Sequence, residues 1–89
     1  MASILVQHTV KDYAEWKKVF DSAKDLRTSS GELSAQVYRD ASDPNKITVM
    51  NKWDSMANAQ KFVQSPEMKA AMEKAGVVGA PTVYFLNEA

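Results

Sequence analysis

The chain has 89 residues, contains no cysteine, and balances eleven basic residues against eleven acidic ones. This length predicts a single domain over residues 1–89, and the lack of cysteine excludes disulfide bonds and thiolate chemistry. The zero net charge argues against partners held by bulk electrostatics, so we expect neither a nucleic-acid nor a membrane partner. Because no apolar run approaches the roughly 20 residues of a membrane span and no signal-peptide pattern opens the chain, we expect a cytoplasmic protein.

The first third of the chain predicts a strand followed by a helix. Residues 3–10 are rich in β-branched residues, which favour a strand. Asp12 is a typical helix N-cap with Glu15 three residues later, and Gly31 is a typical stop. Between them, apolar residues recur at spacings of three and four, which predicts one continuous helix of about four turns: Tyr13, Trp16, Val19, Phe20, Ala23 and Leu26. Lys24 and Arg27 then fall in the last turns, where cations favour the helix dipole.

The remainder predicts a hairpin, two short helices and a last strand. Residues 33–40 and 47–53 are strands joined by a turn at 41–46, which indicates antiparallel pairing. A helical pattern starts after Asp54 and Ser55 and restarts at Ser65-Pro66, so we expect two helices separated at Pro66, the second ending at Gly76. Residues 79–81 are expected to form a loop and residues 82–86 the fourth strand.

The element order β-α-β-β-α-β is typical of a ferredoxin-like α+β fold. Such a fold is a four-stranded antiparallel sheet with the helices on one face. The alternative is a three-stranded sheet in which the first or last segment is only a tail.

Neither face of the predicted sheet is wholly polar. In residues 3–10, for example, Ile4, Val6 and Val10 share one face, and Leu5 lies on the other. A sheet with helices on one side only would leave apolar residues of its second face in water, and such patches usually mark an interface. We therefore expect a homodimer through the sheet face, the alternative being a monomer with scattered surface hydrophobic residues.

The chain resembles a known family along nearly its whole length. The motifs that carry the resemblance are, in chain order, His8-Thr9-Val10, Asp12-Tyr13-x-x-Trp16-Lys17, Phe20-Asp21, Tyr38-Arg39-Asp40, Asp43-Pro44-Asn45, Trp53-Asp54-Ser55, Ser65-Pro66, Ala71-Met72, Ala75-Gly76-Val77 and Pro81-Thr82. On these motifs the chain is similar to the antibiotic biosynthesis monooxygenase-like small proteins of the dimeric α/β-barrel superfamily. The resemblance implies two subunits whose sheets face each other in a barrel, each subunit with a small pocket between sheet and helices.

The resemblance implies several activities, since characterised relatives include cofactor-independent oxygenases of aromatic polyketides, haem-degrading enzymes and small cyclases. In the wider oxygenase pattern, a histidine lies nine residues after the tryptophan of the third strand, which is Trp53 here, and this chain has Phe62 at that position. Haem-degrading members place a tryptophan at the same position and a histidine ten residues later, where this chain has Met72. Neither Phe62 nor Met72 can hydrogen-bond to a haem propionate, and the Met72 thioether is a poor substitute for an imidazole axial ligand. We therefore expect no haem and no other cofactor.

His8 is the only histidine, and so the only side chain that titrates near neutrality without a perturbed environment. It is the candidate catalytic residue, as a general base or as a group that orients a phenolic substrate. The alternative is a half-buried histidine hydrogen-bonded to backbone or to a partner subunit. One histidine without cysteine predicts no metal site.

Four further residues on the predicted strands are candidates for substrate binding: Tyr38, Asn51, Trp53 and Tyr84. Aromatic rings can line an apolar pocket while their N–H and O–H groups orient a polar atom, although ordinary packing is the alternative. Two hypotheses about function follow. One is a cofactor-independent oxygenase or cyclase-type enzyme acting on a small aromatic or polyketide-like molecule. The other is a non-catalytic homodimer that binds a small ligand or has a structural role. A pocket that holds His8 together with Trp53 would favour the enzyme.

Overall fold

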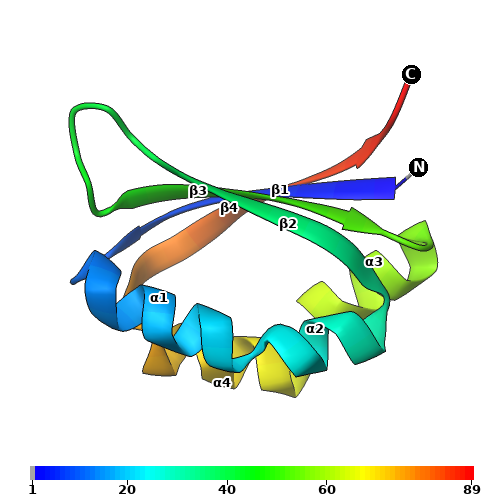
Figure 1. The fold of residues 1–89 in the computed structure, drawn as a ribbon, viewed down its shortest axis with the longest axis horizontal. Helices are drawn as coiled ribbons and strands as arrows, with labels where there is room; N and C mark the ends of the chain where they lie inside the picture. The colour runs from blue at the N-terminus through cyan, green and yellow to red at the C-terminus, as the bar shows by residue number, and fades with distance from the viewer. Residues whose placement is uncertain (1) are drawn as a thin grey trace.

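The computed structural model describes residues 2–89 and contains one antiparallel sheet with four strands in the order β2-β3-β1-β4. The strands are β1 (Ala2–Val10), β2 (Glu32–Arg39), β3 (Lys46–Trp53) and β4 (Val77–Asn87). The helices are α1 (Tyr13–Ser22), α2 (Lys24–Ser30), α3 (Met56–Val63) and α4 (Pro66–Lys74). Figure 1 shows that these helices cover the same face of the sheet. The predicted ferredoxin-like α+β fold is confirmed, and the three-stranded alternative is wrong.

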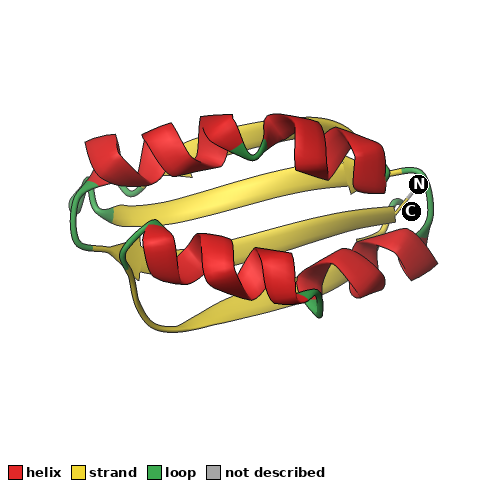
Figure 2. Ribbon diagram, turned by 90° about the horizontal axis from the view of Figure 1, so that it is seen from below, coloured by secondary structure: helices red, strands yellow, loops and turns green. Residues whose placement is uncertain are grey.

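The helices form two rows across the sheet (Figure 2). One row consists of α1 and α2 and the other of α3 and α4, and the rows run in opposite directions, so that α1 lies beside α4 and α2 beside α3. None of the helices in residues 2–89 is long and apolar enough to cross a bilayer.

The first helical region is divided into α1 and α2, although the sequence predicts one continuous helix. The break is at Ala23, whose backbone has φ −90° and ψ 4°. No glycine or proline causes it. Instead, the Arg27 guanidinium donates through Nη1 to the Phe20 carbonyl, and the Ser22 hydroxyl donates to the Val19 carbonyl at 2.8 Å. Side chains that bind helix carbonyls in this way bend or interrupt the ladder of main-chain hydrogen bonds, so the prediction of a single helix is wrong.

The second helical region is divided at Pro66, as predicted. The Ser55 hydroxyl accepts a hydrogen bond from the Asn58 amide at 3.1 Å and caps α3. The Ser65 hydroxyl accepts one from the Met68 amide at 3.2 Å and caps α4, in which Pro66 occupies the first turn. Because proline has no amide hydrogen and disfavours a helical conformation in the residue before it, two short helices form here.

Strand β4 is longer than predicted, because residues 79–81 lie inside it and do not form a separate loop. The pairing with β1 shifts register beyond the Gln7–Thr82 pair. Gly79, with φ +72°, supplies the left-handed backbone that such an irregularity favours. Pro81 is tolerated because β4 is an edge strand that pairs only with β1.

The core lies between the sheet and the helices. Burial alternates along β1 and β3, as expected of strands with one covered face. The buried apolar residues form two clusters: Ala2, Ile4, Val6, Trp53, Ala59 and Phe62 in the first, and Val10, Trp16, Ile47, Val49 and Ala75 in the second. Two polar residues, His8 and Asn51, are buried on the same face as these clusters.

The opposite face of the sheet is not covered by the helices in Figure 1. Here the strand register places Met50, Leu5 and Tyr84 side by side across β3, β1 and β4. Tyr38 is 53% exposed and Tyr84 49%. We call this surface the open sheet face and define it by Leu5, Tyr38, Met50, Tyr84 and Leu86. It carries the apolar residues that the alternation in the sequence predicts.

Candidate functional site

A cavity of about 80 Å³ lies between the sheet and the helices. Its strand residues are Val6, His8, Val49, Asn51 and Trp53, and its helix residues include Trp16, Phe20, Arg27, Phe62, Met68 and Met72. Since the lining draws on both core clusters, the cavity is the place where the two clusters meet. Most of the lining is apolar.

His8 lies on the helix-covered side of β1, and 8% of its surface is exposed. Its ring centroid is 5.6 Å from that of Trp16. Neither Nδ1 nor Nε2 has a hydrogen-bond partner among residues 2–89. Burial lowers the pKa of His8 below its usual 6.5, because desolvation disfavours the imidazolium ion. His8 is therefore a neutral imidazole at physiological pH, with a ring nitrogen that can accept a proton.

Trp53 lies at the end of β3 and is 1% exposed. Its ring packs against Phe62, with the ring centroids 5.1 Å apart. The indole Nε1 is buried and has no acceptor among the described residues. The strand register pairs Trp53 with Ala2 and His8 with Ile47, so the indole and the imidazole lie toward opposite ends of the cavity lining and do not bind the same ligand atom.

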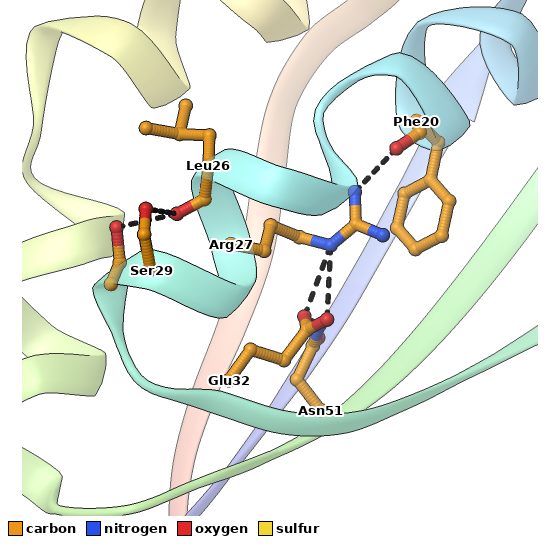
Figure 3. A network of polar contacts seen from close by, with 7 residues as sticks. Phe20, Leu26, Arg27, Ser29, Glu32 and Asn51 are labelled. Atoms are coloured by element: carbon orange, nitrogen blue, oxygen red, sulfur yellow. Dashed lines mark hydrogen bonds and ion pairs between the residues drawn. The ribbon is translucent and has the colours of Figure 1, made fainter.

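A buried ion pair between Arg27 and Glu32 lies beside the cavity (Figure 3). Arg27 Nε lies 3.2 and 3.1 Å from the two carboxylate oxygens of Glu32. The same carboxylate accepts a hydrogen bond from Asn51 Nδ2, and Arg27 Nη1 donates to the Phe20 carbonyl. The guanidinium also lies over the Phe20 ring, 3.7 Å from its centroid. Arg27 and Asn51 line the cavity, whereas Glu32 binds both of them without lining it.

Sequence reasoning missed the burial of Arg27 and did not consider Glu32. A signal of this burial was present in the sequence. Trp16, Phe20, Ala23 and Arg27 follow one another at intervals of four, three and four residues, so Arg27 continues the apolar stripe of the helix. A charged residue on an apolar stripe is expected to need a buried partner. Glu32 provides it as the first residue of β2.

The structure brings three of the five predicted site residues together, since His8, Asn51 and Trp53 all line the cavity. Tyr38 and Tyr84 lie on the open sheet face. Successive side chains of a strand point to opposite faces, so these two tyrosines are on the far side of the sheet from His8. They are not part of this candidate site.

Known proteins share both the sequence pattern and the fold of this chain. The sequence model of the family named antibiotic biosynthesis monooxygenase matches residues 5–74. The chain belongs to this family. No curated protein matches the sequence significantly.

Solved structures of other proteins have the same fold as this chain. A Bordetella bronchiseptica protein that bears the family name aligns with a TM-score of 0.83 and 16% identity, over 99% of this chain and 96% of that one. One from Caulobacter crescentus aligns with a TM-score of 0.78 and 21% identity, over 99% and 89%. SnoaB, a cofactor-independent oxygenase from Streptomyces nogalater, aligns with a TM-score of 0.74 and 13% identity, over 99% and 94%. At these identities the likeness is one of fold.

Phe62 and Met72, at the positions where the resemblance implies a tryptophan and a histidine in haem-degrading relatives, both line the cavity. Residues 2–89 contain no group of three histidine, aspartate or glutamate side chains that could hold a metal ion. The ionisable side chains among the described lining residues are His8 and Arg27.

The cavity is small for an aromatic ligand. An engineered protein cavity of about 150 Å³ holds one benzene ring, so a ring of that size requires this cavity of about 80 Å³ to widen. Met68 and Met72 line it, and the unbranched methionine side chain changes shape readily. Both belong to α4, which has no fully buried residue. The α4 side is therefore where we expect the cavity to adapt to a ligand.

Proposed function

We propose that this protein is a cofactor-independent oxygenase that acts on a small phenolic molecule in the cavity, with His8 as the general base. The observation that carries the proposal is the pair of buried groups without partners, the imidazole of His8 and the indole N–H of Trp53, on one apolar cavity. Membership of the antibiotic biosynthesis monooxygenase family supports it, as does the fold shared with a cofactor-independent oxygenase.

The proposed reaction begins with removal of a proton. The neutral imidazole of His8 accepts the phenolic proton, and the electron-rich phenolate passes one electron to dioxygen. The two radicals combine at the ring carbon para to the hydroxyl. The peroxide takes the proton back from His8 and loses water together with the remaining para hydrogen, which leaves a quinone. One phenol and one dioxygen thus give one quinone and one water, and the substrate itself supplies the electrons.

Two further residues would hold the substrate. The Trp53 N–H lies toward the other end of the cavity from His8 and would donate to the oxygen added at the para carbon, as donors in a water-excluded site do effectively. Asn51, held by Glu32, would contribute the polar part of the wall beside the ring.

We also propose that the protein is a homodimer in which a second copy covers the open sheet face. Half-buried Leu5 and Met50 lie beside exposed Tyr84 in the centre of this face. An apolar surface of this kind usually marks an interface, and two-fold pairing is the commonest way for identical chains to cover it. Tyr38 and Tyr84, which do not reach the cavity, would then be interface residues.

Oxygen uptake with single-ring phenols tests the proposed activity. The expected result is phenol-dependent uptake above the buffer blank, with one dioxygen consumed for each quinone formed. Binding of phenol without any uptake would contradict the oxygenase and favour the alternative, a non-catalytic ligand-binding homodimer.

A further inference from the structure

The charge of Arg27 is cancelled inside the protein. Arg27 lines the cavity and is 7% exposed, a position in which a lone guanidinium would attract an anion. Glu32 lies against it with both carboxylate oxygens within 3.2 Å of Nε. A further donor of Arg27, Nη1, is used by the Phe20 carbonyl, and one face of the guanidinium is covered by the Phe20 ring. The cavity wall therefore presents a cation whose charge is already compensated.

Glu32 occupies the position that a ligand carboxylate would need. Besides Arg27, it accepts a hydrogen bond from Asn51, so the internal carboxylate holds both polar groups of this part of the wall. An anionic ligand would have to displace Glu32 or be buried next to it, and burying a charge without a partner is unfavourable. The other ionisable residue of the lining, His8, is a neutral imidazole and offers no positive charge in compensation.

We propose that the Arg27–Glu32 pair makes the cavity selective for uncharged single-ring ligands, and that Glu32 is the residue that excludes anionic ones. This inference rests on the proposed function, in that it takes the same cavity as the ligand site. It names the class of substrate more narrowly: a neutral phenol is accepted, and an aromatic carboxylate of the same size is rejected.

Binding of phenol and of benzoate to the wild-type protein and to Glu32→Gln tests the inference, with tryptophan fluorescence and calorimetry as readouts. We expect the wild type to bind phenol at least about tenfold more tightly than benzoate, because the carboxylate of benzoate would be buried next to the carboxylate of Glu32. In Glu32→Gln the charge of Arg27 is no longer cancelled, and the phenol-to-benzoate preference should fall by about tenfold or more.

Two control variants separate this effect from a general change of charge. Asp21→Asn makes the same change in net charge at the exposed Lys17–Asp21 pair, so its preference should stay within about twofold of the wild type. The double variant Arg27→Gln/Glu32→Gln removes both buried charges and should again prefer phenol. If Glu32→Gln does not fold, the double variant and the wild type still test the inference.

Equal binding of the two probes by the wild type would overturn the inference, as would an unchanged preference in folded Glu32→Gln, or binding of neither probe. Failure of the oxygenase proposal gives a different result, namely phenol binding with the expected selectivity but no oxygen uptake.

Discussion

His8 and Trp53 line one cavity from the neighbouring strands β1 and β3, and none of their side-chain nitrogens has a hydrogen-bond partner among residues 2–89. A buried donor or acceptor without a partner costs about 1–3 kcal/mol of stability. Such groups are uncommon in folded proteins, and they are concentrated where function requires them. Their position on the same cavity is the basis for treating it as a ligand site.

The buried imidazole should make the protein less stable as the pH falls below neutrality. Burial lowers the pKa of His8 in the folded state, so below about 6.5 the unfolded chain binds a proton that the folded chain does not. The contribution of neutral His8 to the free energy of unfolding is therefore fully present above about pH 6.5, and it is lost progressively as the pH falls toward the lower pKa of the folded state. Urea unfolding at pH 7.5 and pH 5.5, at fixed protein concentration, should show a lower midpoint at the lower pH.

His8→Leu is the matched control for this pH dependence, because leucine has a similar volume and cannot titrate. This variant should lose most of the difference between pH 7.5 and pH 5.5. A wild type whose midpoint does not change over this range would show that the pKa of His8 is not lowered in the folded protein.

Trp16→Ala should destabilise the protein by about 3–5 kcal/mol, the usual range for truncation of a buried large aromatic residue. Trp16 is buried and stacks on Phe20 with a centroid distance of 4.9 Å. Lys18→Ala, on the exposed side of the same helix, should change stability by less than about 0.5 kcal/mol. Urea unfolding measures both variants, and a loss below about 1 kcal/mol for Trp16→Ala would contradict the packing described here.

Gly31→Ala should cost more than Gly79→Ala, although both glycines have positive φ. At Gly31, with φ +119°, a Cβ atom would lie 2.5 Å from Asp54 Oδ1, which accepts a hydrogen bond from Asn58 at 2.9 Å. At Gly79, with φ +72°, a Cβ atom would meet nothing within 4 Å. Backbone strain alone costs about 1–2 kcal/mol at either site, and the clash adds to it at Gly31. Thermal unfolding of the two variants compares them, and equal midpoints would be inconsistent with the contact at Asp54.

A charge in the centre of the open sheet face should dissociate the proposed homodimer. The wild type should sediment at about twice the 9.9 kDa mass of the chain at micromolar concentration. Leu5→Glu places two like charges in the interface and should give a monomer, whereas Lys18→Glu, on α1, should leave the dimer intact. A wild type that sediments as a monomer would refute the dimer, and a dimeric Leu5→Glu would place its interface elsewhere.

Most elements of this fold could be predicted because local rules decide them. The caps at Asp12, Ser55 and Ser65 depend on side chains a few residues from the helix starts. The buried face of β1 follows from strict alternation, which also places His8 among the core residues. The break at Ala23 could not be predicted in this way, because the cause is a tertiary arrangement of the Arg27 side chain rather than a breaking residue.

The candidate site could be predicted only in part, for the same reason. The shared face of Asn51 and Trp53 follows from their spacing on one strand. The pairing of Arg27 with Glu32 depends on how α2 turns back into β2, which no local pattern determines. Tyr38 and Tyr84 were predicted as site residues from their aromatic character, but only the pairing register shows that they lie on the other side of the sheet.

Isotope labelling of the product with wild type and His8→Gln tests the role of His8 and the oxygenase activity together. Each protein is incubated with a single-ring phenol under ¹⁸O₂, and the quinone is analysed by mass spectrometry. The wild type should give a quinone with one ¹⁸O atom, and His8→Gln should form it about 10²–10⁴ times more slowly, the loss expected for removal of a general base. Absence of labelled quinone with the wild type, or an unchanged rate with folded His8→Gln, would contradict base-assisted oxygenation in this cavity.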